Sequence, residues 1–314
     1  MLTRLGNTPV LLAALLTLGA CATVSSSGSH PTASVSAIDK RYLTAADHYV
    51  KIDGVRYRVR VEGKAGTPVI VLIHGFSFSL ETWDAWTQGL APDYRIVRFD
   101  LAGHGLSDAD PKGRYDADTR ARHVVALMKH LGIQHATLAG NSYGGLLAWR
   151  IAAEHPALVD RLILVDSAAF SINGVTDKPA PVPAGMRAYL LDPKPEMVKA
   201  SASIIFANPA ALPPERLEMM RNMIARPGNG PALVTHLEQF TLPAPETQLA
   251  RIKAPTLILW GSKDHVVPLD QSYRLRDAIK GSQLVVYEGV GHAPQEEASA
   301  ASLATVRQFL TQKQ

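Results

Sequence analysis

The most constraining feature of the sequence is a glycine-rich turn between a strand-like and a helix-like segment. It reads Gly140-Asn141-Ser142-Tyr143-Gly144-Gly145, after the strand-like segment 136–139 and before the helix-like stretch 146–154. A G-x-S-x-G pentapeptide alone is common in loops, but between a strand and a helix it is typical of a nucleophile elbow. There the serine occupies a strained turn that frees its hydroxyl from the sheet, and Gly140 and Gly144 let strand and helix approach closely. The pattern therefore predicts Ser142 as a nucleophile.

Strand-like and helix-like segments alternate along most of the chain. Continuous β-branched runs such as 69–73 indicate strands buried on both faces, and amphipathic stretches such as 117–131 separate them. Asp53-Gly54 indicates a hairpin turn between the first two strands. The alternation predicts an α/β fold with a mostly parallel, doubly wound, eight-stranded sheet. The expected strands are 48–52, 55–61, 69–73, 94–99, 136–139, 162–165, 256–259 and 283–287.

One long stretch interrupts the alternation. Residues 168–249 contain no buried strand run, are rich in proline, and show short helical patterns such as 215–224. A structureless loop of that length inside a compact domain is improbable. The stretch is therefore predicted to be a helical cap inserted over the carboxyl edge of the sheet, between core segments 46–167 and 250–314.

A serine hydroxyl needs a base that takes its proton and a carboxylate that orients the base. His292 is the last histidine of the chain and lies in a Gly-flanked loop after the last expected strand. Asp264 lies in the loop after the seventh strand, so Ser142, Asp264 and His292 would fall on three successive loops at one sheet edge. Asp166, at the end of the sixth strand, is the alternative carboxylate, and we expect it to bond loop backbone amides instead.

Catalysis by such a serine also requires an oxyanion hole. One expected donor is the backbone amide of Tyr143, directly after the nucleophile. The other is the amide of Phe76, which Gly75 would aim into the site by allowing a tight turn after the third strand. His74, beside this turn, is expected to make structural hydrogen bonds.

These segments together resemble the α/β-hydrolase superfamily. The matching segments are, in order, His74-Gly75-Phe76, Asp100-Leu101-Ala102-Gly103-His104-Gly105-Leu106-Ser107, the serine elbow, the Asp264 loop and Gly291-His292. The resemblance covers about residues 48–312 and implies the single-domain type with a helical cap, a group that includes many esterases and carbon–carbon bond hydrolases. Haloalkane dehalogenases and epoxide hydrolases carry Asp in the elbow, so Ser142 argues against both.

The site residues predict hydrolysis of carboxylic esters through a covalent acyl-enzyme on Ser142. Small to medium apolar substrates are expected because the cap is rich in apolar side chains, most of which would form its own core while a few line a pocket. These are Phe170, Met186, Tyr189, Ile204, Ile205, Phe206, Met219, Met220 and Met223. A carbon–carbon bond hydrolase, lactonase, amidase or acyltransferase could use the same triad. A non-catalytic envelope protein, either binding or structural, is a further alternative.

The first residues have the pattern of an exported protein. Arg4 precedes an apolar run, 10–18, that suits a signal-peptide core and is too short to cross a bilayer comfortably. The run ends in Leu18-Gly19-Ala20-Cys21, which resembles the bacterial lipobox. The resemblance implies that residues 1–20 are removed and that several acyl chains on Cys21 anchor the protein in a membrane. An ordinary secretory signal with a chance cysteine is the alternative.

The segment after the cysteine indicates where in the cell the protein is expected to lie. Residues 21–45 begin rich in Ser, Ala and Gly and are expected to form a flexible tether. Ala22 stands where an Asp would favour retention in the inner membrane. We therefore expect an enzyme that is lipid-anchored in the bacterial cell envelope, at the outer membrane, facing the periplasm or the surface.

Composition and the absence of certain motifs limit the classes of ligand that the chain is expected to bind. The net charge is +4, and no run of five Lys or Arg residues occurs, so the chain lacks the electrostatic footprint of a nucleic-acid-binding protein. Cys21 is the only cysteine, which excludes an intramolecular disulfide. With no H-E-x-x-H motif, Cys/His cluster or phosphate-binding glycine loop, no metal or cofactor is expected. The expected partner is a small ester-like substrate, and no obligate protein partner is indicated.

Overall fold

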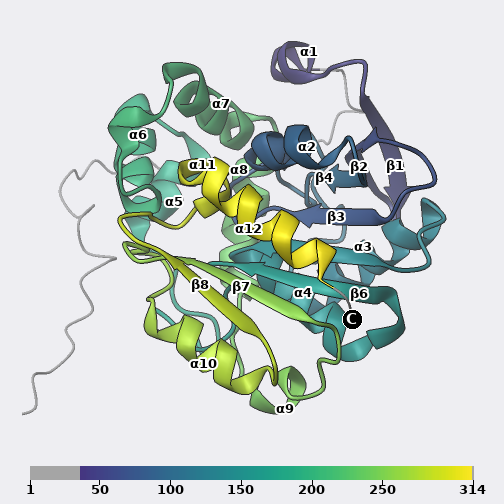
Figure 1. Cartoon of the computed structure of the whole chain (residues 1–314). Helices are drawn as coiled ribbons and strands as arrows, with labels where there is room; N and C mark the ends of the chain where they lie inside the picture. The colour runs from purple at the N-terminus through teal and green to yellow at the C-terminus, as the bar shows by residue number, and fades with distance from the viewer. Residues whose placement is uncertain (1–35, 313–314) are drawn as a thin grey trace, which may run out of the picture.

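The computed structural model describes residues 36–312, which form an eight-stranded sheet between layers of helices (Figure 1). The strand order is β1-β2-β4-β3-β5-β6-β7-β8. Strand β2 pairs antiparallel with β1 and β4, and all other neighbours are parallel. The strands are β1 (Asp47–Ile52), β2 (Val55–Gly63), β3 (Val69–Ile73), β4 (Arg95–Phe99), β5 (Ala136–Asn141), β6 (Val159–Val165), β7 (Thr256–Gly261) and β8 (Gln283–Tyr287). The predicted fold class is confirmed.

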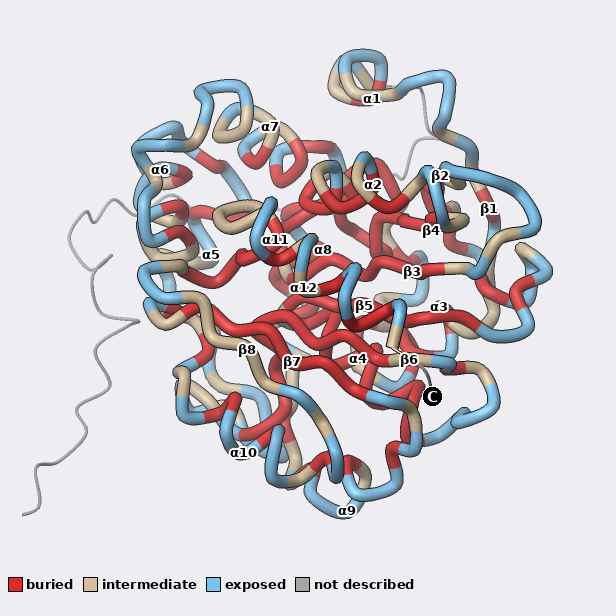
Figure 2. The backbone as a smooth tube through the Cα atoms, viewed as in Figure 1, coloured by how far each residue is buried: buried red, intermediate tan, exposed pale blue. Residues whose placement is uncertain are grey.

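Successive residues of the central strands contribute to hydrophobic cores on opposite faces of the sheet. In β7, Leu257 and Leu259 pack into one core, whereas Ile258 and Trp260 pack into the other. Helices cover both faces, so these strands are buried throughout (Figure 2), which explains the unbroken apolar runs in the sequence. The helices of the two layers are α2 (Asp84–Leu90), α3 (Ala117–His130), α4 (Tyr143–Glu154), α10 (Asp270–Ala278), α11 (Pro294–Glu297) and α12 (Ser299–Thr311).

The connection from β6 to β7 is helical. It contains α5 (Ala184–Leu191), α6 (Pro195–Ile205), α7 (Pro214–Ala225), α8 (Asn229–Gln239) and α9 (Glu246–Leu249). Helices α5 to α8 share a third hydrophobic core, which also includes Phe78 and Ala293 from the loops after β3 and β8. In Figure 1, α5, α6 and α7 lie together at one end of the sheet. Because Phe78 and Ala293 follow strands, that end carries the carboxyl termini of β3 and β8.

One expected boundary differs from the structure. Residues 37–42, within the expected tether 21–45, form helix α1 (Ala37–Tyr42). The Ser36 hydroxyl accepts a hydrogen bond from the Asp39 amide, and the Asp39 carboxylate accepts one from the Ser36 amide, a reciprocal capping box. Asp39 is buried and pairs with the Arg226 guanidinium at 2.6 Å. This long-range ion pair, which local composition could not reveal, fixes the helix against the inserted segment.

The expected signal peptide, Cys21 and residues 21–35 of the expected tether lie outside the described residues. Within residues 36–312, no helix combines the length and the apolar character that a membrane crossing requires.

Candidate active site

Ser142 lies at the sharp turn from β5 into α4. Its backbone has φ 55° and ψ −118°, a conformation unfavourable for a residue with a side chain. Its amide donates to the Val165 carbonyl at 2.9 Å, and its carbonyl accepts from the amides of Leu146 and Ala168, both at 3.1 Å. A side chain on Gly144 would overlap the Ile73 backbone oxygen. Backbone hydrogen bonds therefore fix the turn, and close packing requires glycine at position 144, two residues after the serine.

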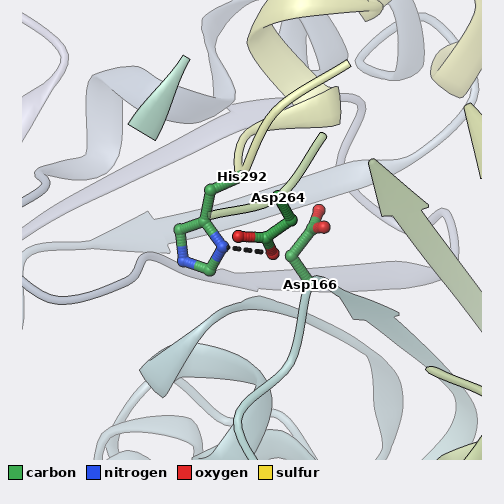
Figure 3. Close-up of side chains that lie close together, drawn as sticks. All are labelled: Asp166, Asp264 and His292. Carbon is green, nitrogen blue, oxygen red and sulfur yellow. Dashed lines mark hydrogen bonds and ion pairs between the residues drawn. The ribbon is translucent and has the colours of Figure 1, made fainter. Parts of the chain in front are cut away.

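The imidazole of His292 and the carboxylate of Asp264 form a buried pair (Figure 3). His292 Nδ1 lies 2.7 Å from Asp264 Oδ2. The other carboxylate oxygen, Oδ1, accepts from the amides of Val266 and Val267 at 2.7 and 2.9 Å. Because an ionised carboxylate only accepts hydrogen bonds, Nδ1 of His292 carries the proton, and Nε2 remains available as a base.

Asn141, the residue before the serine, joins the loops of the site. Its side-chain amide donates to the carbonyls of Val165 and His292, at 3.2 and 3.1 Å. The His292 amide in turn donates to the Ile205 carbonyl at the end of α6, at 2.7 Å. The serine turn, the histidine loop and the inserted helices are thus connected by hydrogen bonds.

Ser142 and His292 line the same cavity, which has a volume of about 260 Å³. Most of its wall is apolar and comes from the loop after β6 and from α5, α6 and α8. Ile172, Val175, Met186, Ile204, Leu237 and Phe240 are examples. Among the described residues that line the cavity, none is Asp, Glu, Lys or Arg. The site therefore accommodates an uncharged, apolar group next to the serine.

The loop after β3 lies directly against the serine turn. A Cβ atom on Gly75 would lie 3.0 Å from the Ser142 Cβ atom. Phe76 and Tyr143 both line the cavity, and within residues 36–312 their backbone amides donate to no other protein group. Tyr143 is also the first residue of α4, where amides lack intrahelical acceptors. The structure thus brings together the residues expected to form an oxyanion hole.

His74 holds this loop in place, as expected. Its Nδ1 donates to the Gly75 carbonyl at 2.7 Å, and its Nε2 accepts from the Leu101 amide at 2.9 Å. Both ring nitrogens are engaged by backbone, so the side chain has no free atom for catalysis. Burial lowers the pKa of His74 to about 4, which keeps the ring neutral.

The sequence did not predict a cluster of buried rings that lies next to the cavity. His236 from α8 lines the cavity, and its ring centroid lies 4.3 Å from that of Tyr143. Next to it are His104 and the Arg120 guanidinium, which lies 5.5 Å from the Tyr143 ring centroid. Burial and, second, the Arg120 charge lower the pKa of His104 and His236 well below the usual range. These histidines are thus neutral, and only their long-range packing identifies them as neighbours of the site.

Asp166, the alternative carboxylate, lies beside Asp264 (Figure 3). Its Oδ1 accepts from the Gly261 amide at 2.9 Å, which is the expected type of backbone bond. Asp166, Asp264 and His292 form the one group of potential metal ligands found within residues 36–312, with their ligand atoms within 4.8 Å of one another. Because Asp264 and His292 are bonded to each other, these atoms are already engaged. The closeness of the two carboxyl groups was missed, although both follow neighbouring strands.

Comparisons with known proteins extend this picture. A family model described as alpha/beta hydrolase fold matches residues 68–299. The AB hydrolase superfamily protein YisY of Bacillus subtilis is 31% identical over 270 residues, covering 83% of this chain and 98% of that protein. A 2-hydroxy-6-oxononadienedioate/2-hydroxy-6-oxononatrienedioate hydrolase of Klebsiella pneumoniae is 29% identical over 252 residues, covering 78% and 88%. The crystal structure of a membrane phospholipase A, a bacterial virulence factor, is similar with a TM-score of 0.73 and 28% identity, covering 84% and 85%.

Proposed function

The chain belongs to the α/β-hydrolase fold family and is a hydrolase, and we propose that it cleaves carboxylic esters of small to medium apolar substrates through an acyl-enzyme on Ser142. One observation carries the proposal. Ser142 on its strained turn and His292, which is paired with Asp264, line one cavity that has no Asp, Glu, Lys or Arg in its lining.

The proposed reaction has two halves. Ser142 Oγ attacks the ester carbonyl while His292 Nε2 takes the hydroxyl proton, and the Asp264 carboxylate stabilises the resulting imidazolium. The amides of Phe76 and Tyr143 donate to the oxyanion of the tetrahedral intermediate. The intermediate collapses to the acyl-enzyme, and the alcohol leaves with the proton from His292. Water then attacks the acyl group and gives a proton to His292, which passes it to Ser142 Oγ as the bond between Oγ and the acyl carbon breaks and the acid is released.

The inserted segment supports an uncharged substrate, and we propose that residues 168–249 act as the cap that selects it. The Klebsiella relative is named for a dienedioate, which is a dicarboxylate. Recognition of a carboxylate in an apolar site normally requires Arg or Lys, and the cavity lining offers neither. The similar membrane phospholipase A bears the name of an ester-cleaving enzyme, which supports ester chemistry.

The first experiment measures hydrolysis of p-nitrophenyl esters of increasing acyl length. We expect Ser142→Ala to lower the rate by several orders of magnitude and to abolish labelling by a fluorophosphonate probe. Ser203→Ala, which removes an exposed hydroxyl from α6, is the matched control and keeps both activities. Labelling without ester turnover would direct the search to lactone, amide and carbon–carbon substrates. A protein that neither labels nor turns over would have to be regarded as a binding protein.

We also propose that Cys21 is lipidated and anchors the enzyme at the outer membrane of a bacterial envelope. The support is the sequence Leu18-Gly19-Ala20-Cys21 after an apolar run, together with Ala22. The test is metabolic labelling with an alkyne fatty acid, followed by membrane fractionation. The wild-type protein should be labelled and sediment with outer membranes, whereas Cys21→Ala should be unlabelled. A wild-type protein that is processed and soluble would exclude the anchor.

A further inference from the structure

Asp166 is a buried carboxyl group that the proposed reaction does not use. It lies at the end of β6 with no exposed surface, and its backbone has φ 44°. Its amide donates to the Leu259 carbonyl of β7 at 3.0 Å. In Figure 3 its side chain lies beside Asp264, on the side of Asp264 away from His292. A strained backbone is retained where the surroundings fix it, so the position of this carboxyl group needs a reason.

The contacts of the Asp166 and Asp264 carboxyl groups indicate which of the two holds a proton. Oxygen atoms of the buried Asp166 and Asp264 carboxyl groups lie within 4.8 Å of each other, and two buried like charges this close are so unfavourable that one of the two groups keeps a proton. Asp264 accepts from two backbone amides and from His292 Nδ1, which stabilises its ionised form. Asp166 accepts only from the Gly261 amide. Its Oδ2 atom, buried, receives no donor within the described residues. The proton therefore resides on Asp166 Oδ2.

Burial, and next the charge of Asp264, raise the pKa of Asp166 well above its usual range. The other titratable groups around it are His292, from the loop after β8, and Glu297, from α11. Burial also raises the pKa of Glu297, although backbone amides, including that of Gly291 at 2.9 Å, donate to its carboxylate. A second ionised carboxylate beside Asp264 would thus face a negative charge rather than a cation.

We propose that Asp166 is a positioning residue whose protonated carboxyl group donates to Asp264 and holds it against His292. The proposal rests on the proposed catalytic roles of Asp264 and His292. While Asp166 is neutral, Asp264 keeps a single orientation toward Nδ1. When Asp166 ionises, the hydrogen bond is lost and the two like charges repel each other, which displaces Asp264.

Two substitutions separate the hydrogen bond from the backbone requirement. In Asp166→Asn, Oδ1 can still accept from the Gly261 amide while Nδ2 donates to Asp264 at every pH. Asp166→Gly tolerates the positive φ and removes the side chain. At neutral pH we expect kcat of the Asn variant within about threefold of wild type. The Gly variant should lose up to about 100-fold in kcat with little change in KM, because misplacement of a catalytic group affects the chemical step.

The pH profile gives a readout that a purely structural role would not move. The wild-type kcat/KM should decline at alkaline pH as Asp166 ionises, and the Asn variant should lack this decline. Identical alkaline profiles for wild type and Asn variant would overturn the proposal, as would a Gly variant with wild-type kcat.

A measurement of unfolding stability tests whether native Asp166 is protonated, and it does not depend on turnover. Asp ionises near pH 4 in the unfolded chain, whereas native Asp166 keeps its proton. Above that pH the unfolding equilibrium constant of wild type, relative to Asp166→Asn, should rise about tenfold per pH unit until Asp166 ionises in the native state. If the ratio of the two unfolding equilibrium constants were independent of pH, the assignment of a proton to native Asp166 would be wrong. If the ratio changes as expected but no ester is cleaved, the proposed substrate class is wrong and the proton assignment stands.

Discussion

We expect the His74 ring to make the native protein sensitive to acid. The ring donates from Nδ1 to the Gly75 carbonyl and accepts at Nε2 from the Leu101 amide. Only a neutral imidazole can do both, because a protonated ring has no acceptor nitrogen. Burial lowers its pKa from 6.5 to about 4. Protonation would leave the Leu101 amide without its partner and would loosen the loop that carries Gly75 and Phe76.

The size of the effect follows from this pKa difference. In the unfolded chain the histidine binds a proton below pH 6.5, whereas the native ring does not until about pH 4. The stability contributed by the neutral ring is therefore complete above pH 6.5 and is lost as the pH falls toward 4. At 1.36 kcal/mol per pKa unit, the loss is about 1.4 kcal/mol at pH 5.5 and about 3 kcal/mol near pH 4.

Urea unfolding followed by tryptophan fluorescence between pH 4.5 and 7.5 measures this loss. The reference protein is His74→Asn, which cannot titrate at this position, and His155→Asn removes an exposed histidine as a control. His104 and His236 remain in all three proteins, so their contributions differ between the proteins only through the coupling of His104 to residue 74. The unfolding free energy of wild type and of the control should fall more steeply with acid than that of His74→Asn. Parallel curves for wild type and His74→Asn would refute the reasoning.

Three further predictions concern the site and its supports. Asp264→Asn places an amide donor or a mispaired oxygen against His292 Nδ1, so kcat on the best ester should fall on the order of 10⁴-fold, and a loss below tenfold would contradict the assigned role. Gly144→Ala forces a Cβ atom into the Ile73 backbone oxygen, so we expect urea titrations to give a free energy of unfolding lower by about 1–3 kcal/mol. The variant should also lose fluorophosphonate labelling, and full labelling would show that the turn can adjust. Arg226→Met leaves the buried Asp39 carboxylate without its cation and should cost about 3–5 kcal/mol in the same titrations, part of which a second change, Asp39→Asn, should restore; equal stability of the single and double variants would show that the ion pair contributes little.

The sheet could be predicted from the sequence because its signals are local. Each central strand is buried on both faces, so apolar residues occur in unbroken runs such as Val69–Ile73. The order of the strands' carboxyl ends then follows from the parallel fold, which is why Ser142, Asp264 and His292 could be expected at one edge before any distance was known. Strand ends were harder to predict. Strand β5 was expected to end at Ala139 but continues through Gly140 to Asn141, where the sequence no longer shows a strand-like run.

The remaining features depend on contacts between distant residues. Helix α1 is short, and its burial depends on Arg226, which is 187 positions away along the chain. The same holds for Arg58, a fully buried guanidinium that pairs with Asp47, Glu81 and Asp100. Nothing in the local sequence around such residues distinguishes them from a solvated charge. Only the folded arrangement shows that three carboxylates surround one arginine.

The hydrogen bonds between the inserted segment and the histidine loop bear on how specificity and rate are linked. The His292 amide donates to Ile205 at the end of α6, and the Glu297 carboxylate accepts from the amides of Ala207 and Asn208. Ile204 and Ile205 line the cavity next to these bonds. A change that moves the end of α6 to enlarge the cavity therefore also moves the backbone that holds His292. We therefore expect changes at this end of the cavity to alter substrate range and kcat together. Leu237 and Phe240 of the α8 region also line the cavity, but within the described residues they have no such hydrogen bond to the His292 backbone.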